Sequence, residues 1–110
     1  GSRYFWNGVT LNGAPVASVA RRYLERPPCP VKDVTGHRRM KHLDGLCRDY
    51  MVGGAIVLLQ KFCHPHEFDM PALADLFKAR DIPYLTLEMD TTIPYGQLRT
   101  RIEAFMEMLS

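Results

Sequence analysis

The chain has 110 residues, with 14 lysines and arginines against 12 aspartates and glutamates, so its net charge is +2 when histidine is neutral. A hydrophobic fraction of 46% is ordinary for a globular domain and excludes a disordered tail, a collagen repeat or a disulfide-stapled miniprotein. The basic residues are scattered along the sequence, and the net charge is too small to predict a nucleic-acid partner. We expect one domain with its own core.

The sequence predicts neither a membrane span nor a secretion signal. The longest apolar run, Gly53 to Leu59, is far shorter than the roughly 20 residues that a membrane helix needs, and no basic region followed by an apolar one opens the chain. We therefore expect a cytoplasmic protein whose three cysteines are reduced thiols. Residues 1–2 resemble a tag remnant, which leaves 3–110 for the fold.

The N-terminal part predicts one helix between two irregular segments. Residues 3–12 mix aromatic residues with Asn and Gly, and they are expected to form an edge strand or a packed arm. A helix is expected from Pro15 to Arg26, because apolar residues recur at helical spacing and proline suits a first turn. A loop is expected over 27–30, since Pro27 removes a backbone donor and disfavours helix at the residue before it.

A second helix is expected from an N-cap at Thr35 to about Tyr50. Its apolar residues recur at spacings of three and four and predict one buried stripe. Cys47 lies on this stripe, so we expect it to be a small core residue rather than a ligand.

The C-terminal part alternates strands and helices. The continuous apolar run Gly54 to Leu59 predicts a parallel strand buried on both faces, and residues 84–87 predict a second strand. A helix between them is expected to be capped by Asp69, with Pro71 in its first turn. The last helix is expected over 95–109.

This order predicts an α/β fold: a parallel-sheet βαβ fragment of the flavodoxin or Rossmann-like three-layer kind, with helices packed on the sheet. Only two strands are clear, or three if the N-terminal arm is a strand. A two-stranded parallel sheet would leave both edges open. We therefore expect residues 3–110 to be a partial, C-terminal α/β domain of a larger subunit.

Groups capable of chemistry follow the predicted strands, where open parallel sheets bind their ligands. Cys63, Glu88 and Asp90 fall at this edge, and so would Cys29 if its proline-rich loop folds over the same edge. Cysteines in rigid proline-flanked loops resemble iron–sulfur ligands, although buried loop cysteines are also common. Glu88 and Asp90 could be acid–base groups or could bind a basic side chain, and Lys61 is expected to be a solvated charge.

Two histidines flank Pro65 directly after Cys63. Cys63 and His66 have the C-x-x-H spacing of zinc ligands, but one such pair is weak evidence. We expect His64 and His66 to be hydrogen-bonding loop residues near a site. The alternative function is a non-enzymatic zinc-binding or redox-sensing module that uses Cys29, Cys63 and these histidines.

Four motifs together resemble the C-terminal region of the 2-hydroxyacyl-CoA dehydratase/benzoyl-CoA reductase family. Their order and spacing fit across about residues 20 to 109, the last quarter or third of a family subunit. The motifs are Arg26-Pro-Pro-Cys-Pro-Val-Lys32, Gln60-Lys-Phe-Cys-His-Pro-His66, Leu87-Glu-Met-Asp90 and Gly96-Gln-Leu-Arg-Thr-Arg-Ile-Glu-Ala-Phe105.

The resemblance implies an iron–sulfur subunit that carries a [4Fe–4S] cluster or a variant and acts on an acyl-CoA thioester. It implies a second family subunit as dimer partner and a separate ATP-dependent iron–sulfur activator that supplies one electron. Cys29 and Cys63 match the cluster ligands of the family. Lys61, His64, His66, Glu88 and Asp90 would form the surroundings of the substrate or the cluster.

Two features separate this chain from the family pattern. Many members have Asp where this chain has His64, and this difference, with the stretch 88–92, slightly favours the benzoyl-CoA reductase branch or a close relative of it. The other cluster ligands of the family lie in an N-terminal domain. Because a [4Fe–4S] cluster needs three or four thiolates, we expect the 110-residue chain alone to be inactive and without a stable cluster.

A third hypothesis is a subunit-interface role, in which the aromatic arm Tyr4-Phe5-Trp6 is covered in the intact protein. Concentration-dependent association that is lost on Trp6→Ser would support it.

Overall fold

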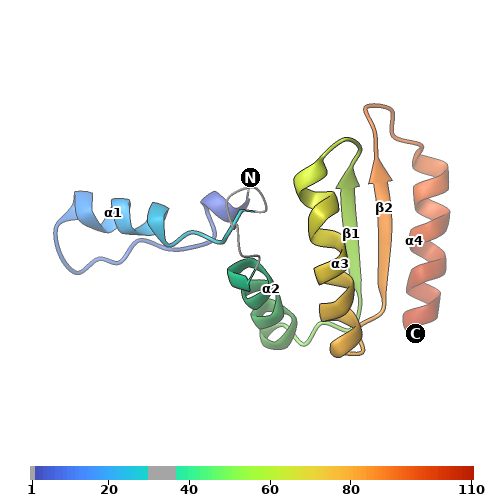
Figure 1. Cartoon of the computed structure of the whole chain (residues 1–110), viewed down its shortest axis with the longest axis horizontal. Helices are drawn as coiled ribbons and strands as arrows, with labels where there is room; N and C mark the ends of the chain where they lie inside the picture. Colours follow the sequence, from blue (N-terminus) through green and yellow to red (C-terminus); the bar gives the residue numbers. More distant parts are fainter. Residues whose placement is uncertain (1, 30–36) are drawn as a thin grey trace. The chain divides into compact units, whose positions relative to one another are not determined.

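The computed structural model describes residues 2–29 and 37–110, and it divides the chain into two units, residues 1–42 and 43–110. Thr35, the expected N-cap, lies outside the described residues. The elements are η1 (Ser2–Tyr4), α1 (Pro15–Leu24), α2 (His37–Asp49), β1 (Ala55–Gln60), α3 (His64–Ala79), β2 (Tyr84–Met89) and α4 (Tyr95–Leu109), as Figure 1 shows. The boundary between the units falls within α2, and each unit is described separately below.

The first unit begins with residues 3–12, which were expected to form an edge strand or a packed arm and most of whose side chains are exposed. No strand forms there; instead, hydrogen bonds hold the arm to the end of α1. Arg22 Nε donates to the Asn7 carbonyl at 2.7 Å, and a second Arg22 nitrogen donates to the Tyr4 carbonyl at 2.7 Å. Asn7 Nδ2 donates to the Glu25 carbonyl at 2.9 Å. The arm is therefore ordered by backbone carbonyls rather than by strand pairing.

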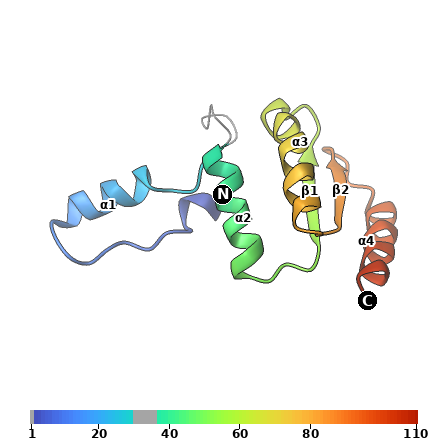
Figure 2. The same ribbon diagram turned by 60° about the horizontal axis from the view of Figure 1, so that its bottom comes forward.

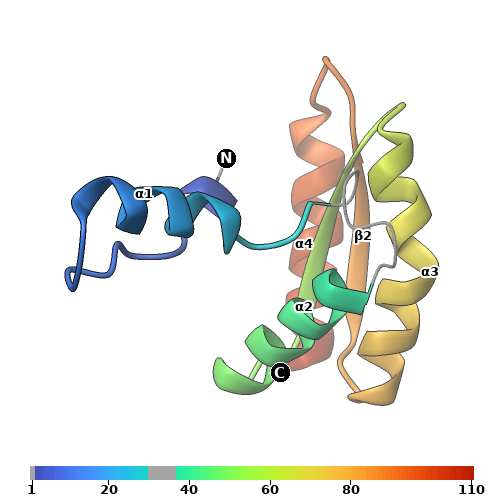
Figure 3. The same cartoon turned by 60° about the vertical axis from the view of Figure 1, so that its left-hand side comes forward.

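The second unit contains the predicted parallel βαβ arrangement. β1 and β2 pair in parallel, with Ala55 opposite Tyr84 and Gln60 opposite Met89, and α3 makes the crossover between them (Figure 2). α3 and α4 lie on either side of the pair of strands (Figure 3). The core residues are Leu73, Phe77, Ile82, Leu87 and Phe105.

The expectation that β1 is buried on both faces is wrong. Its side chains alternate between half-buried and exposed, with Ile56 42% and Leu58 60% exposed. A continuous apolar run cannot show which face of a strand is covered, and only one face of β1 is shielded by the described residues of its unit. β2 continues two residues beyond the predicted end, so Glu88 lies inside the strand.

The start of α3 was also predicted wrongly. The helix begins at His64, five residues before Asp69, and Pro65 occupies its first turn. Pro71, the residue that suggested the later start, lies inside the helix. Both prolines suit a first turn, and the sequence alone does not decide between them. The other helix bounds were predicted to within about two residues, the usual uncertainty at helix ends.

Candidate functional site

The carboxyl ends of β1 and β2 are followed by three residues singled out from the sequence, Lys61, Cys63 and Asp90. The Lys61 backbone N–H donates to the Met89 carbonyl at 2.9 Å and extends the strand pairing by one step. Phe62 then turns the chain with a φ of 64°, a left-handed conformation that costs a non-glycine residue roughly 1–2 kcal/mol. This turn places Cys63 at the carboxyl edge of the sheet, as the sequence predicted.

Cys63 is the N-cap residue of α3. Its carbonyl accepts hydrogen bonds from the His66 and Glu67 amides at 3.0 and 3.2 Å, whereas its side chain makes no capping hydrogen bond. The side chain is half-buried and is not in a disulfide. The sulfur is therefore not used for capping, and it lies at a helix N-terminus, where negative charge is favoured. Such a position suits a thiolate that binds a metal.

The two histidines lie in the first turn of α3, so the expectation that they are loop residues is wrong. His64 Nδ1 lies 3.1 Å from Glu67 Oε2, and the His64 ring is largely exposed. His66 is half-buried. The expected hydrogen bonding is confirmed for His64 only, and its partner Glu67 belongs to the same helix.

Lys61 and Asp90 form an ion pair between the ends of the two strands. Lys61 Nζ donates to Asp90 Oδ2 at 3.0 Å, and Asp90 Oδ1 accepts from the Thr91 amide at 2.7 Å. The hydrogen bond from Lys61, with that from the Thr91 amide, lowers the pKa of Asp90 below its usual value. The same contact raises the pKa of Lys61. Asp90 thus binds a basic side chain, the second of the two roles considered for it.

A polar cleft of about 470 Å³ opens beside this ion pair, lined by residues from β2 and α4 as well as Lys61. Glu88 and Arg101 both line it, and an Arg101 N–H donates to the Thr86 carbonyl at 2.9 Å. Arg101 lies on α4. No local signal in the sequence could have shown that its side chain reaches back to β2.

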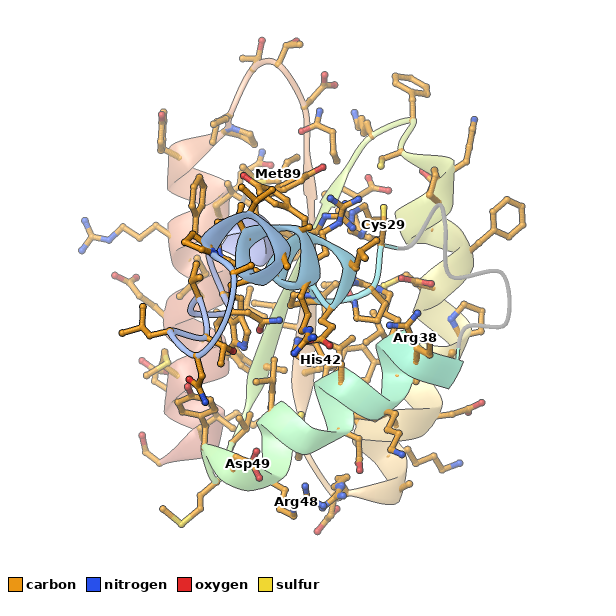
Figure 4. The ribbon with its side chains drawn as sticks, turned by 90° about the vertical axis from the view of Figure 1, so that its left-hand side faces the viewer. Cys29, Arg38, His42, Arg48, Asp49 and Met89 are labelled. Carbon is orange, nitrogen blue, oxygen red and sulfur yellow. The ribbon has the colours of Figure 1, made fainter. Side chains whose placement is uncertain are left out.

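Cys29 lies in the other unit, in the loop that follows α1. Pro27 beside it is buried, and Cys29 itself is half-buried and not in a disulfide. Figure 4 labels Cys29 together with Arg38 from the first turn of α2. Because the two units are not placed relative to each other, the convergence of Cys29 and Cys63 on one centre stays a prediction.

Cys47 is less buried than expected for a core residue. It lies half-buried on α2 beside Leu43 and Leu46, which are also half-buried. Tyr50, the approximate end expected for this helix, lies beyond the helix and is 66% exposed. The helical spacing was correct, but a spacing cannot show how deeply a stripe is covered.

Across residues 2–29 and 37–110, no three His, Cys, Asp or Glu side chains gather in a way that could hold a metal ion. Within the same part, no helix is long and apolar enough to cross a membrane.

Charge divides unevenly between the two units, which corrects the expectation that the basic residues are scattered. Residues 1–42 contain eight Lys and Arg against two Asp and Glu, which gives +6. Residues 43–110 contain six Lys and Arg against ten Asp and Glu, which gives −4. The small net charge of the whole chain conceals this division.

Comparison with known proteins finds one matching family and several curated relatives. The model of the family 2-hydroxyglutaryl-CoA dehydratase, D-component, matches residues 1–109. The (R)-phenyllactyl-CoA dehydratase beta subunit of Clostridium sporogenes is 29% identical over 96 residues, 86% of this chain and 25% of that subunit. The lactoyl-CoA dehydratase subunit beta of Anaerotignum propionicum is 26% identical over 98 residues, 88% of this chain and 26% of that subunit.

A third relative, the (R)-2-hydroxyglutaryl-CoA dehydratase subunit beta of Acidaminococcus fermentans, is 35% identical over 72 residues, which cover 64% of this chain and 19% of that subunit. The chain thus spans about a quarter or less of the length of these relatives. All three are named as dehydratases, so the preference for the benzoyl-CoA reductase branch stays an untested prediction.

Proposed function

Because this chain belongs to the family of the 2-hydroxyglutaryl-CoA dehydratase D-component, we propose that it forms the thiol-bearing part of a 2-hydroxyacyl-CoA dehydratase subunit. Cys29 and Cys63 are the two thiols that it contributes to an iron–sulfur cluster. The observation that carries this proposal is the position of Cys63, half-buried after β1, with a sulfur that makes no capping bond.

The donor set fits part of a cluster site. Iron–sulfur clusters are bound by cysteine thiolates, and both loop cysteines lie outside disulfides. Each lies in a proline-containing segment: Cys29 follows the buried Pro27, and Cys63 precedes Pro65 in the first turn of α3. A [4Fe–4S] cluster needs three or four thiolates, so the remaining ligands come from outside these 110 residues.

Charged and polar residues near Cys63 would form the electrostatic surroundings of the cluster. Lys61 lies two residues before the thiol, and its Nζ donates a hydrogen bond to Asp90 Oδ2 at 3.0 Å. The ion pair also fixes the ammonium group at the edge of the polar cleft. We propose that Lys61 holds a fixed positive charge beside the cluster and that the cleft, with Glu88, contributes to its polar surroundings.

When bound, the cluster supplies single electrons for radical dehydration of a 2-hydroxyacyl-CoA thioester. Since the relatives are named as beta subunits, we also propose a second dehydratase subunit as partner. A separate ATP-dependent iron–sulfur activator provides the electron in this scheme.

Replacing each cysteine in turn tests the proposal, in a subunit of the length of the relatives that is produced with its partner and purified without oxygen. We expect Cys29→Ser and Cys63→Ser each to abolish stoichiometric iron and sulfide and the associated charge-transfer absorbance. Cys47→Ser is the matched control, because Cys47 is equally half-buried but lies on a helix, and it should keep its iron. Full iron content in both loop variants would disprove the proposal.

A further inference from the structure

Three arginines surround one small cavity in the first unit. The cavity has a volume of about 150 Å³. Arg3 comes from η1, Arg26 from the segment after α1, and Arg38 from the first turn of α2. The other described residues that line it are Leu24, Pro27, Pro28 and Cys29, so no carboxylate is among them.

Two of the three arginines are held in place by the same tyrosine. The guanidinium carbons of Arg3 and Arg26 lie 4.8 and 5.0 Å from the centre of the Tyr4 ring. Arg3 also donates a hydrogen bond to Tyr4 Oη at 3.2 Å. Cation–π contacts of this kind restrict where an arginine side chain can lie, so both charges are held near the same ring.

The three arginines at this cavity have no carboxylate partner in the described part of the chain. No ion pair joins Arg3, Arg26 or Arg38 to a carboxylate among residues 2–29 and 37–110. Like charges held close together repel one another, and this unit carries a net charge of +6. An anion in the cavity would relieve that repulsion.

We propose that this three-arginine pocket binds a phosphoryl group. A guanidinium group presents N–H donors in a planar fork that matches phosphate oxygens. Three such forks suit a doubly charged group with three terminal oxygens better than a singly charged carboxylate. The cavity is also of the right order of size for one phosphoryl group, and the two prolines form an apolar wall beside it.

The phosphoryl group has two chemical sources, free phosphate or the phosphate of a larger molecule. The larger molecule would be one that carries a nucleotide phosphate. Binding of the phosphoryl group itself rests on the pocket alone.

Titration of the 110-residue chain with inorganic phosphate tests the proposal, with the arginine side-chain N–H signals followed by NMR at constant ionic strength. We expect saturable shifts at Arg3, Arg26 and Arg38, and none with acetate. Arg26→Gln and Arg38→Gln should each weaken phosphate binding by about tenfold or more, as loss of a charge-assisted contact does. Two separate variants are used because Arg26→Gln also removes the stacking on Tyr4.

Arg21→Gln is the matched control. It removes the same charge from the same unit, but Arg21 lies exposed on α1 and does not line the cavity. It should change the affinity less than about twofold. Equal weakening by all three variants would show a diffuse charge effect and overturn the proposal. So would the absence of saturable shifts, or equal binding of acetate.

A parallel titration with adenosine 3′,5′-bisphosphate, and with adenosine as its phosphate-free control, separates the two sources. Tighter binding of the bisphosphate than of inorganic phosphate assigns the pocket to a nucleotide-bearing ligand, and equal affinity assigns it to free phosphate. Binding of adenosine as tight as that of the bisphosphate would contradict a phosphoryl site. These measurements need no cluster, so their failure would leave the cysteine test unaffected, and the reverse also holds.

Discussion

The two units of the chain differ in how they are held together and in the charge they carry. All five buried apolar residues of the described core belong to residues 43–110. In the described part of residues 1–42, Pro27 is the only buried residue. The second unit carries a net charge of −4 and the first +6. One unit is thus organised by a core and the other by polar contacts around arginines.

This difference predicts that substitutions in the second unit affect the free energy of unfolding and that substitutions in the first unit affect anion binding. Burial of apolar side chains is the largest favourable term in folding, so the second unit should respond most to changes in its core. In the first unit, Arg22 reaches two backbone carbonyls and Tyr4 positions two further arginines. Changes there should alter anion binding more than they alter the free energy of unfolding.

Truncation of the most buried side chain should give the largest effect. Leu87 in β2 is 1% exposed, and Leu87→Ala should lower the free energy of unfolding by about 3 kcal/mol, through lost burial and the cavity left behind. Urea unfolding followed by far-ultraviolet circular dichroism measures this change.

The matched control for this prediction is Leu24→Ala in the first unit. Leu24 is 81% exposed on α1, so its truncation should change the free energy of unfolding by less than about 0.5 kcal/mol. Equal effects of the two substitutions would contradict the view that only the second unit depends on a core.

A smaller loss of stability should follow substitution of Gly54, which lies against Leu109 at the end of α4. A Cβ atom at Gly54 would lie 2.6 Å from Leu109 Cδ1, closer than two carbon atoms can approach. Leu109 is 37% exposed and lies at the last helical residue, so it can turn aside, and we expect Gly54→Ala to cost about 1 kcal/mol. Urea unfolding measures this cost.

Gly53 offers a matched control for this prediction. A Cβ atom there would meet nothing within 4 Å, so Gly53→Ala should be neutral or stabilise by up to about 1 kcal/mol, through lost freedom of the unfolded chain. Adding Leu109→Ala to Gly54→Ala should recover part of the cost, because the clash is between these two residues. Full additivity of the two changes would rule out the contact as the cause.

The second unit was more predictable from the sequence than the first, for reasons that lie in particular residues. The continuous apolar run before Gln60 indicated a strand, and Leu73 and Phe77 recur at helical spacing, so β1 and the body of α3 were placed nearly correctly. The start of α3 was missed because two prolines each suited a first turn. The arm over 3–12 has no period, and its order depends on contacts from Arg22 that are distant in sequence.

The candidate site was predictable only where it follows directly from strand order. Cys63 and Asp90 come after neighbouring parallel strands, so their place at one edge of the sheet followed from the topology. The sequence left two roles open for Asp90, acid–base chemistry or binding of a basic side chain. The hydrogen bond from Lys61, 29 residues away in sequence, shows the second. The three arginines around Cys29 were missed, since net charge alone hides how charge divides between regions of a chain.

The smallest predicted effect concerns an ion pair within the second unit, between α2 and the end of α3. Arg80 donates to both Asp44 carboxylate oxygens, at 2.6 and 2.7 Å. This hydrogen bonding lowers the pKa of Asp44 in the folded chain. A carboxyl whose folded pKa is depressed stabilises the fold above its unfolded pKa of about 3.9, and that contribution is lost as the pH falls through the folded value.

Asp44→Asn should therefore lower the urea midpoint slightly at about pH 6, and it should make the midpoint less sensitive to acid between about pH 5 and pH 3. Asp49→Asn is the control, because Asp49 pairs only with its exposed neighbour Arg48 at 3.3 Å on the same helix, and such a pair contributes little. Urea unfolding of the three proteins at both ends of this range measures the difference. If Asp44→Asn and wild type lose stability equally on acidification, the acid response of the second unit arises from carboxylates other than Asp44.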